Sequence, residues 1–230
     1  MPTATGKTRS PEVARFLNIA WRPISLPTAA GDRYGSSRIP LTSYFQDALA
    51  GAERPAWVYI HAPEKDPEST KELEEDIFGK DELLVASHFF DCYRISADEL
   101  SEDERKSLAK RLPAFVLVGT DGRIAAQHKG SAHPDGLLSF LSKGFKTAYG
   151  TGIESRLERF KDVLRRLEAA EDDVAEASQK LKDTAAAAKP DKPKDLDRVE
   201  KAREVLAKAQ GVLASLREER TKLLDVSIKS

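Results

Sequence analysis

Two stretches near the end of the chain carry apolar residues at alternating steps of three and four. The first contains Phe160, Val163, Leu167, Ala170, Val174, Ala177 and Leu181. The second contains Val199, Ala202, Leu206, Ala209, Leu213 and Leu216, and Leu223 returns to the same frame after Arg220 interrupts it. Such heptad spacing predicts two helices that pack along one seam.

The two predicted helices are separated by a short proline-containing segment. Pro190 and Pro193 interrupt the helical pattern, because proline lacks a backbone donor and its ring clashes with the preceding turn. Asp197 followed by Glu200 resembles a capping box, which predicts that the second helix begins at Asp197. A short break between two matched seams indicates an antiparallel coiled-coil hairpin. Because alanines in the seam bury little area, we expect the hairpin to gain stability from the domain, a second copy or a partner.

Upstream of the hairpin, helical and strand-like patterns alternate. The expected helices cover Pro11–Leu17, Thr42–Gly51, Glu68–Phe78, Ser101–Leu112 and Pro134–Phe145. The expected strands cover Ala56–His61, Phe89–Ile95, Ala114–Val118 and Arg123–His128. Asn18–Ile24 is expected to be an edge segment of the sheet. Thr42 or Ser43 is the expected cap of its helix. The Asp121–Gly122 pair predicts a hairpin turn in which both residues adopt positive φ.

Composition shifts near Gly150–Gly152, where aromatic residues and glycines nearly cease. The shift predicts three segments: residues 1–41 as an extended arm or an ordered strap, residues 42–150 as an α/β domain, and residues 151–230 as the helical hairpin.

Charge and composition narrow the expected partners and compartment. The chain carries 37 basic and 38 acidic residues without a basic stripe, so no nucleic-acid partner is expected. No run of apolar residues is long enough to span a membrane, and the first residues lack the apolar core of a secretory signal. A single cysteine, Cys92, excludes an intrachain disulfide. Together these features predict a cytoplasmic protein without a membrane partner.

The order of the predicted elements, and two segments in particular, resemble the thioredoxin-like fold. LPAFVLVGTDGRIAAQHKG (Leu112–Gly130) is similar to that family's cis-proline strand, hairpin and final strand. TSYFQDALAGAERPAWVYIH (Thr42–His61) is similar to its lead-in to the first core strand. The resemblance implies a three-layer α/β sandwich with a mixed sheet, a cis bond before Pro113, and a groove beside that proline.

The chain departs from the family where a redox centre is expected. A CxxC motif would fall near Pro67–Thr70, yet no cysteine lies between His61 and Phe78. Thiol–disulfide exchange needs a thiolate and usually a second, resolving thiol. We therefore expect a redox-inactive domain that uses the groove for binding, with Pro67, Ser69, Thr70 and Pro113 as candidate binding residues.

The remaining reactive residues raise two other chemistries, thiol catalysis and metal binding. Cys92 is either a buried strand residue or the nucleophile of a single-cysteine thiol oxidoreductase or peroxidase. His61, Glu64 and Asp66, with His88, His128 and His133, lack the spacing of a known metal motif, so neither a metal nor a cofactor is expected.

The function expected from the sequence is therefore that of a scaffold or protein–protein interaction module, acting through the groove and the hairpin. The hairpin is expected to bind a protein partner or a second copy. Enzymatic activity through Cys92 is the first alternative, and a structural subunit of a larger assembly is the second.

Overall fold

The computed structural model describes residues 10–27, 38–62, 70–71, 73–108, 111–130 and 133–225. Contacts group the chain into two compact units. Among the described residues, one unit holds residues 10–15 and 158–225, and the other holds Phe16–Leu157. This grouping divides the chain at different places from the three segments expected from composition, because the first helix groups with the C-terminal helices.

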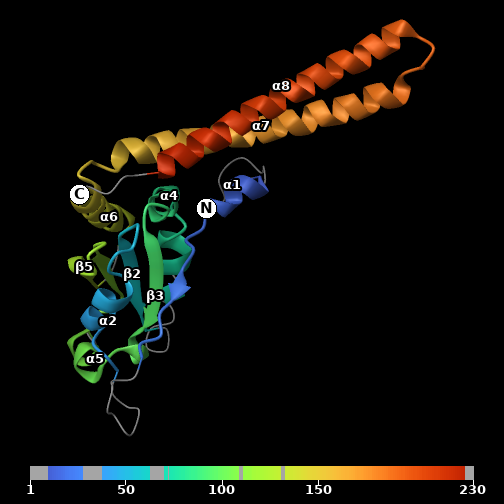
Figure 1. The fold of residues 1–230 in the computed structure, drawn as a ribbon. Coiled ribbons are helices and arrows are strands. Elements are labelled where there is room, and N and C mark those ends of the chain that lie inside the picture. The colour runs from blue at the N-terminus through green and yellow to red at the C-terminus, as the bar shows by residue number, and fades with distance from the viewer. Residues whose placement is uncertain are drawn as a thin grey trace. The chain divides into compact units, whose positions relative to one another are not determined.

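The larger unit is built on a five-stranded mixed sheet with the order β1-β3-β2-β4-β5 (Figure 1). Its strands are β1 (Arg22–Pro23), β2 (Ala56–His61), β3 (Asp91–Ser96), β4 (Ala114–Val118) and β5 (Ile124–Lys129). Strand β3 is parallel to both β1 and β2. Strand β4 is antiparallel to β2, and β5 is antiparallel to β4. The expected mixed α/β architecture is thus confirmed.

The central strands are buried on both faces, as their uninterrupted apolar sequences require. Every residue of β4 is buried, and only His61 of β2 is partly exposed. Both strands begin and end where the sequence predicts. Strand β5 instead alternates half-buried and exposed residues, which is typical of a strand at the edge of a sheet.

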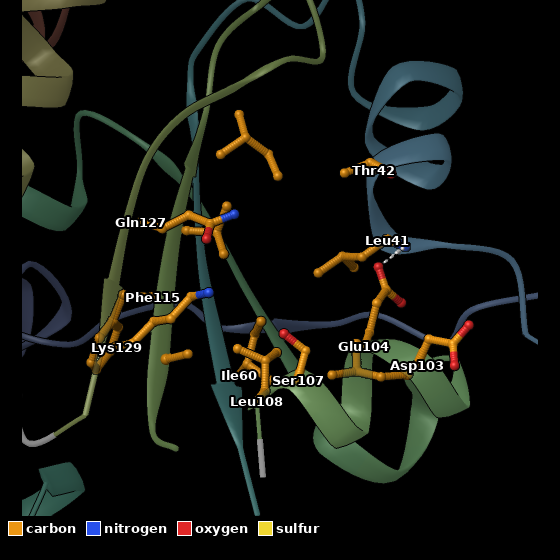
Figure 2. Close-up of a pocket in the computed structure, with 14 residues that line it drawn as sticks. Leu41, Thr42, Ile60, Asp103, Glu104, Ser107, Leu108, Phe115, Gln127 and Lys129 are labelled. Atoms are coloured by element: carbon orange, nitrogen blue, oxygen red, sulfur yellow. Dashed lines mark hydrogen bonds between the residues drawn. The ribbon is translucent and has the colours of Figure 1, made fainter. Parts of the chain in front are cut away.

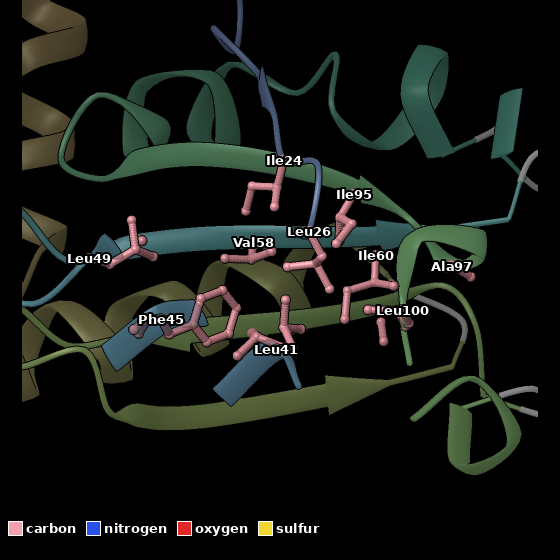
Figure 3. Packing of buried hydrophobic residues seen from close by; sticks show 14 residues of the cluster. Ile24, Leu26, Leu41, Phe45, Leu49, Val58, Ile60, Ile95, Ala97 and Leu100 are labelled. Carbon is pink, nitrogen blue, oxygen red and sulfur yellow. The ribbon is translucent and has the colours of Figure 1, made fainter. Parts of the chain in front are cut away.

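Two apolar layers cover the sheet. On one face, side chains of β2, β3 and β4 join residues from α2 (Leu41–Ala48) and from the segment after β1; the cluster includes Ile24, Leu26, Leu41, Phe45, Val58, Ile60 and Ile95 (Figure 3). The opposite face carries large aromatic side chains. There Tyr59 stacks on Phe115 with 5.4 Å between ring centroids, and Phe78 meets both rings at their edges.

The remaining helical segments of this unit are short, except the last. Those whose bounds the structure describes are η1 (Leu73–Ile77, a π-helix), α4 (Asp81–Ser87), η2 (Ala97–Glu99), α5 (Glu102–Leu108) and α6 (Pro134–Tyr149). Helix α6 begins with proline, whose missing N–H is not needed there. It ends at Gly150, which has a φ of 73°.

Several predicted boundaries are wrong. The stretch expected as a strand from Phe89 begins only at Asp91, because Phe89 and Phe90 lie in the turn that ends α4, a helix absent from the sequence prediction. The helix expected to reach Leu112 ends at Leu108 among the described residues. Helix α2 begins at Leu41, and neither Thr42 nor Ser43 caps it.

The turn between β4 and β5 also differs from the prediction. Gly122 donates its backbone N–H to the Gly119 carbonyl at 3.0 Å, and Gly119 donates to the Arg123 carbonyl at 2.8 Å. Gly122 has a φ of 74°, whereas Asp121 does not have positive φ. The connection is therefore longer than a two-residue turn, and the strand register shifts between Leu117 and Val118.

The smaller unit contains α1 (Pro11–Arg15), α7 (Glu154–Ala187, from residue 158 onward) and α8 (Pro193–Leu224). The two long helices pack together as an antiparallel pair, as the heptads predict (Figure 1). Arg166 of α7 donates to Glu219 of α8 at 3.3 Å. The predicted start at Asp197 is wrong, since α8 begins at Pro193, which the first turn of a helix tolerates.

Burial along the helical pair falls towards its connecting loop. Phe160, Val163 and Leu167 are buried in α7, and Leu213, Leu216 and Leu223 are buried in α8. Nearer the loop, Val174, Leu181 and Leu206 are only partly buried. The small side chains in that part of the seam explain the difference, because alanine covers little of the facing helix.

Candidate functional site

The carboxyl end of β2 and the start of β4 lie side by side. Ile60 pairs with Ala114 in the antiparallel register, which places His61 and Pro113 at the same end of the sheet. The Leu112–Pro113 bond is cis, as the resemblance implies. Pro67, Ser69, Glu64 and Asp66 lie outside the described residues. Of the expected binding residues, the structure therefore places Thr70 and Pro113 alone.

Thr70 lies near the aromatic face of the sheet. It is half-buried and helical. Burial is the main cause that raises the pKa of Tyr59 above its ordinary value, and the Thr70 side chain acts on that pKa in the opposite direction. Thr70 thus contacts the phenol end of a buried tyrosine.

His61 is held against the aromatic layer. Its ring stacks on Tyr59 at 5.2 Å, and burial lowers its pKa below the ordinary value for histidine. The Nδ1 atom is buried without a hydrogen-bond partner among the described residues. The ring is therefore neutral at pH 7. Across the described ranges, no group of three or more His, Cys, Asp or Glu side chains could hold a metal ion.

Cys92 is the second residue of β3. Its side chain is 5% exposed, and its thiol contacts the Ser87 carbonyl at 3.5 Å. Burial, with a smaller contribution from Asp91, raises the pKa of the thiol far above its ordinary value. A thiol in this position is protonated and out of reach of a dissolved substrate, so Cys92 lacks both properties of a redox nucleophile.

A cavity of about 300 Å³ opens beside the Pro113 end, on the face that carries α2 and α5 (Figure 2). Its apolar lining comes from Leu41, Ile60, Leu100, Leu108, Ala114, Phe115, Val116 and Ile124. Its polar lining comes from Thr42, Asp103, Glu104, Ser107, Gln127 and Lys129. A volume of this size accommodates one large side chain or a small organic molecule.

The acidic side of this cavity is used for structure. Glu104 accepts a hydrogen bond from the Leu41 backbone N–H at 2.8 Å and another from the Ser101 hydroxyl at 2.7 Å. The first bond is visible in Figure 2 between α5 and the start of α2. Both carboxylate oxygens are therefore occupied, and Glu104 fixes the two helices that form one wall.

The opposite side of the cavity is formed by β5. The side chains of Gln127 and Lys129 extend from this strand into the opening (Figure 2). Lys129 makes no ion pair within the described part of the chain and is exposed. The opening therefore offers an ammonium group and an amide beside an apolar floor. This arrangement suits binding of an apolar group next to a negative charge.

The sequence reasoning missed this cavity. Strand alternation does place Gln127 and Lys129 on one face of β5. The opposite wall comes from α5, whose position relative to β5 depends on tertiary packing. No local pattern reveals a cavity assembled from residues so far apart along the chain.

None of the helices in the described ranges is both long and apolar enough to cross a membrane. No protein-family model matches this sequence, and no curated protein matches it either.

Proposed function

We propose that the larger unit is a thioredoxin-like domain that has no thiol chemistry and acts as a protein-binding module. The strand order and the helices on both faces of the sheet support the thioredoxin-like assignment. The absence of cysteine between His61 and Phe78 supports loss of the redox role. In this proposal the helical hairpin is a second contact surface of a scaffold protein.

The observation that carries the binding role is the cavity between α2, α5 and the sheet. It combines an apolar floor with the ammonium group of Lys129 at its edge, and Lys129 makes no ion pair with any residue that the structure describes. Peptide-binding sites commonly use such an apolar pocket with a few polar groups that set orientation. The alternative, a single-cysteine oxidoreductase, needs an accessible and ionisable Cys92, and its burial argues against that role.

The binding role is tested by selecting peptides from a random library displayed on phage against the full chain. Ser107→Trp places a bulky ring at the cavity opening, because Ser107 is an exposed lining residue. Ser139→Trp, at an exposed position of α6, is the matched control. We expect selected peptides to bind the wild type and Ser139→Trp, and to lose at least about tenfold in affinity with Ser107→Trp. Failure to select any peptide sensitive to Ser107→Trp would refute the binding role.

The absence of thiol chemistry needs a separate measurement. We expect Cys92 to react slowly with a thiol reagent in the native chain and fully after denaturation. We also expect no turnover of disulfides or peroxides. Turnover that disappears in Cys92→Ser would establish the oxidoreductase alternative.

A further inference from the structure

Strand β5 ends the sheet, and no strand in the described ranges pairs with its outer edge. It is six residues long, whereas the opposite edge strand, β1, has two residues. An edge strand of this length presents backbone N–H and C=O groups that can pair with another extended chain.

The register identifies the outward groups. Gly130 donates its N–H to the Pro113 carbonyl at 3.0 Å, which continues the β4–β5 pairing by one residue. In an antiparallel ladder, hydrogen-bonded pairs recur at every second residue, so His128 also directs its backbone groups towards Phe115 of β4. Lys129 lies between these two residues, and Gln127 lies on the other side of His128, so Gln127 and Lys129 direct their N–H and C=O groups away from β4.

The same two residues line the cavity. Gln127 and Lys129 are exposed, and their side chains lie on the cavity face of β5 (Figure 2). His128 lies on the other face, 6.1 Å from the Phe140 ring of α6. A strand added beside β5 would lie about 4.8 Å away and direct alternate side chains towards the cavity opening.

We propose that β5 and the cavity together bind an extended peptide segment of a partner protein by strand addition, which rests on the binding role proposed above. The peptide backbone pairs with the outward groups of Gln127 and Lys129. A large apolar side chain of the peptide extends over Gln127 into the cavity. An acidic side chain two positions away, on the same face of the peptide, pairs with the Lys129 ammonium.

The charges around the opening favour this occupant. Lys129 has no ion-pair partner among the described residues, whereas the Glu104 carboxylate is already occupied by two hydrogen bonds. Asp103 belongs to α5, on the far side of the opening from β5 (Figure 2). An acidic group beside β5 therefore meets a lysine first.

A second copy of the chain fits less well. If two β5 strands paired edge to edge, each would present Ile124, Gln127 and Lys129 on the cavity face, because the register shift between Leu117 and Val118 turns Ala125 to the other face. Each copy would then bring a lysine to the opening and no acidic side chain. The site therefore fits a foreign segment that carries both a large apolar residue and an acidic residue.

Two substitutions at Gln127 separate strand addition from simple insertion into the cavity. Gln127→Pro removes the outward N–H, and proline is tolerated where an edge strand faces solvent. Gln127→Ala removes the same side chain and keeps the N–H. The peptide that is most enriched in the selection on the full chain is synthesised and titrated against each variant. We expect Gln127→Pro to bind this peptide about tenfold more weakly than Gln127→Ala does. Lys129→Glu tests the proposed ion pair. We expect it to weaken the binding of a peptide that carries the acidic residue about fivefold more than the binding of the same peptide with alanine at that position.

Amide hydrogen exchange gives a readout that does not depend on variants. In the full chain, we expect the bound peptide to slow exchange at Gln127 and Lys129, while His128 is protected with or without peptide. Peptides that depend on Ser107 but bind Gln127→Pro and Gln127→Ala equally, without new protection in β5, would overturn strand addition and leave the binding role intact. Concentration-dependent dimers with protected β5 amides in the absence of peptide would show that a second copy occupies the edge.

Discussion

The Glu12 carboxylate of α1 accepts hydrogen bonds from the Arg217 guanidinium of α8, with Nε at 3.0 Å and Nη2 at 2.5 Å from the same oxygen. Arg220, one turn later, donates to the other oxygen at 2.6 Å. Two positive groups thus share one carboxylate whose side chain is only 20% exposed. The hydrogen bond from Arg217 is the largest cause that lowers the pKa of Glu12 from 4.5 to about 2.

This contact predicts that docking of α1 on the helical pair weakens in acid. A carboxylate with a lowered pKa stabilises the folded arrangement above its ordinary pKa, and that contribution is lost as the pH falls from about 4.5 to 2. We expect protection of the Ala14 amide against hydrogen exchange to fall across this range. Glu12→Gln should reduce the protection at neutral pH by about 1 kcal/mol and remove most of the pH dependence.

The matched control for Glu12 is Glu200→Gln. Glu200 pairs with Arg203 within α8, and both side chains are more than half exposed. An exposed pair of this kind contributes little to stability, so the control should change the exchange of α1 by less than about 0.3 kcal/mol. If both variants behave alike, the Glu12 contact does not hold α1.

The sequence predicts the parts of this fold that local patterns determine. Strands β2 and β4 have uninterrupted apolar sequences because both of their faces are covered, and their bounds are predicted to the residue. The heptads predict α7 and α8 because one apolar seam recurs along each helix. In α4, the residues from Leu83 to Ser87 are all buried, so no one-sided pattern distinguishes this helix from a strand.

The candidate site depends on contacts that no local pattern contains. The Glu104 carboxylate reaches Leu41, which is 63 residues earlier in the chain. Capping residues of helices usually lie next to the helix, so the sequence pointed to Thr42 or Ser43. The expected groove residues were placed by resemblance, and Pro67 and Ser69 lie outside the described residues.

The close contact between α6 and β4 makes a second prediction. A Cβ atom on Gly144 would collide with the Leu117 side chain, which is buried in the sheet. Gly144→Ala improves helix propensity by about 1 kcal/mol but forces the packed layers apart, which typically costs about 1–3 kcal/mol. We expect net destabilisation in urea unfolding followed by tryptophan fluorescence, since the only tryptophans, Trp21 and Trp57, lie in the larger unit.

A double substitution tests whether the collision with Leu117 is the cause. In a Leu117→Ala background, the added methyl group of Gly144→Ala enters space that the leucine has vacated. The cost of Gly144→Ala should therefore be smaller there than in the wild type, with a coupling energy of at least about 0.5 kcal/mol. Strict additivity of the two substitutions would contradict the packing explanation.

Two glycines with similar backbone angles should respond differently to alanine. Gly122 and Gly51 have φ of 74° and 81°, so either substitution strains the backbone. At Gly122 the new Cβ would also lie 2.7 Å from the Phe45 carbonyl oxygen, whereas at Gly51 nothing lies within 4 Å. We expect Gly51→Ala to cost about 1 kcal/mol and Gly122→Ala clearly more, measured by the same urea unfolding. Equal costs would mean that the backbone of α2 moves aside freely.

Glu104 is predicted to stabilise the larger unit through the first turn of α2. The Leu41 N–H has no partner within its own helix, and Pro40, the residue before it, supplies no side-chain cap. Removing the carboxylate in Glu104→Ala leaves this donor in a buried residue without a partner, which costs about 1–3 kcal/mol. Glu104→Gln retains an acceptor oxygen and should lose less than about 1 kcal/mol. Glu102→Ala is the control, because Glu102 forms an exposed pair with Lys106 on the same helix, and such a pair adds little to stability. We therefore expect the urea midpoint to be highest for Glu102→Ala, lower for Glu104→Gln and lowest for Glu104→Ala. If Glu104→Ala had the same midpoint as Glu102→Ala, water would satisfy the Leu41 donor.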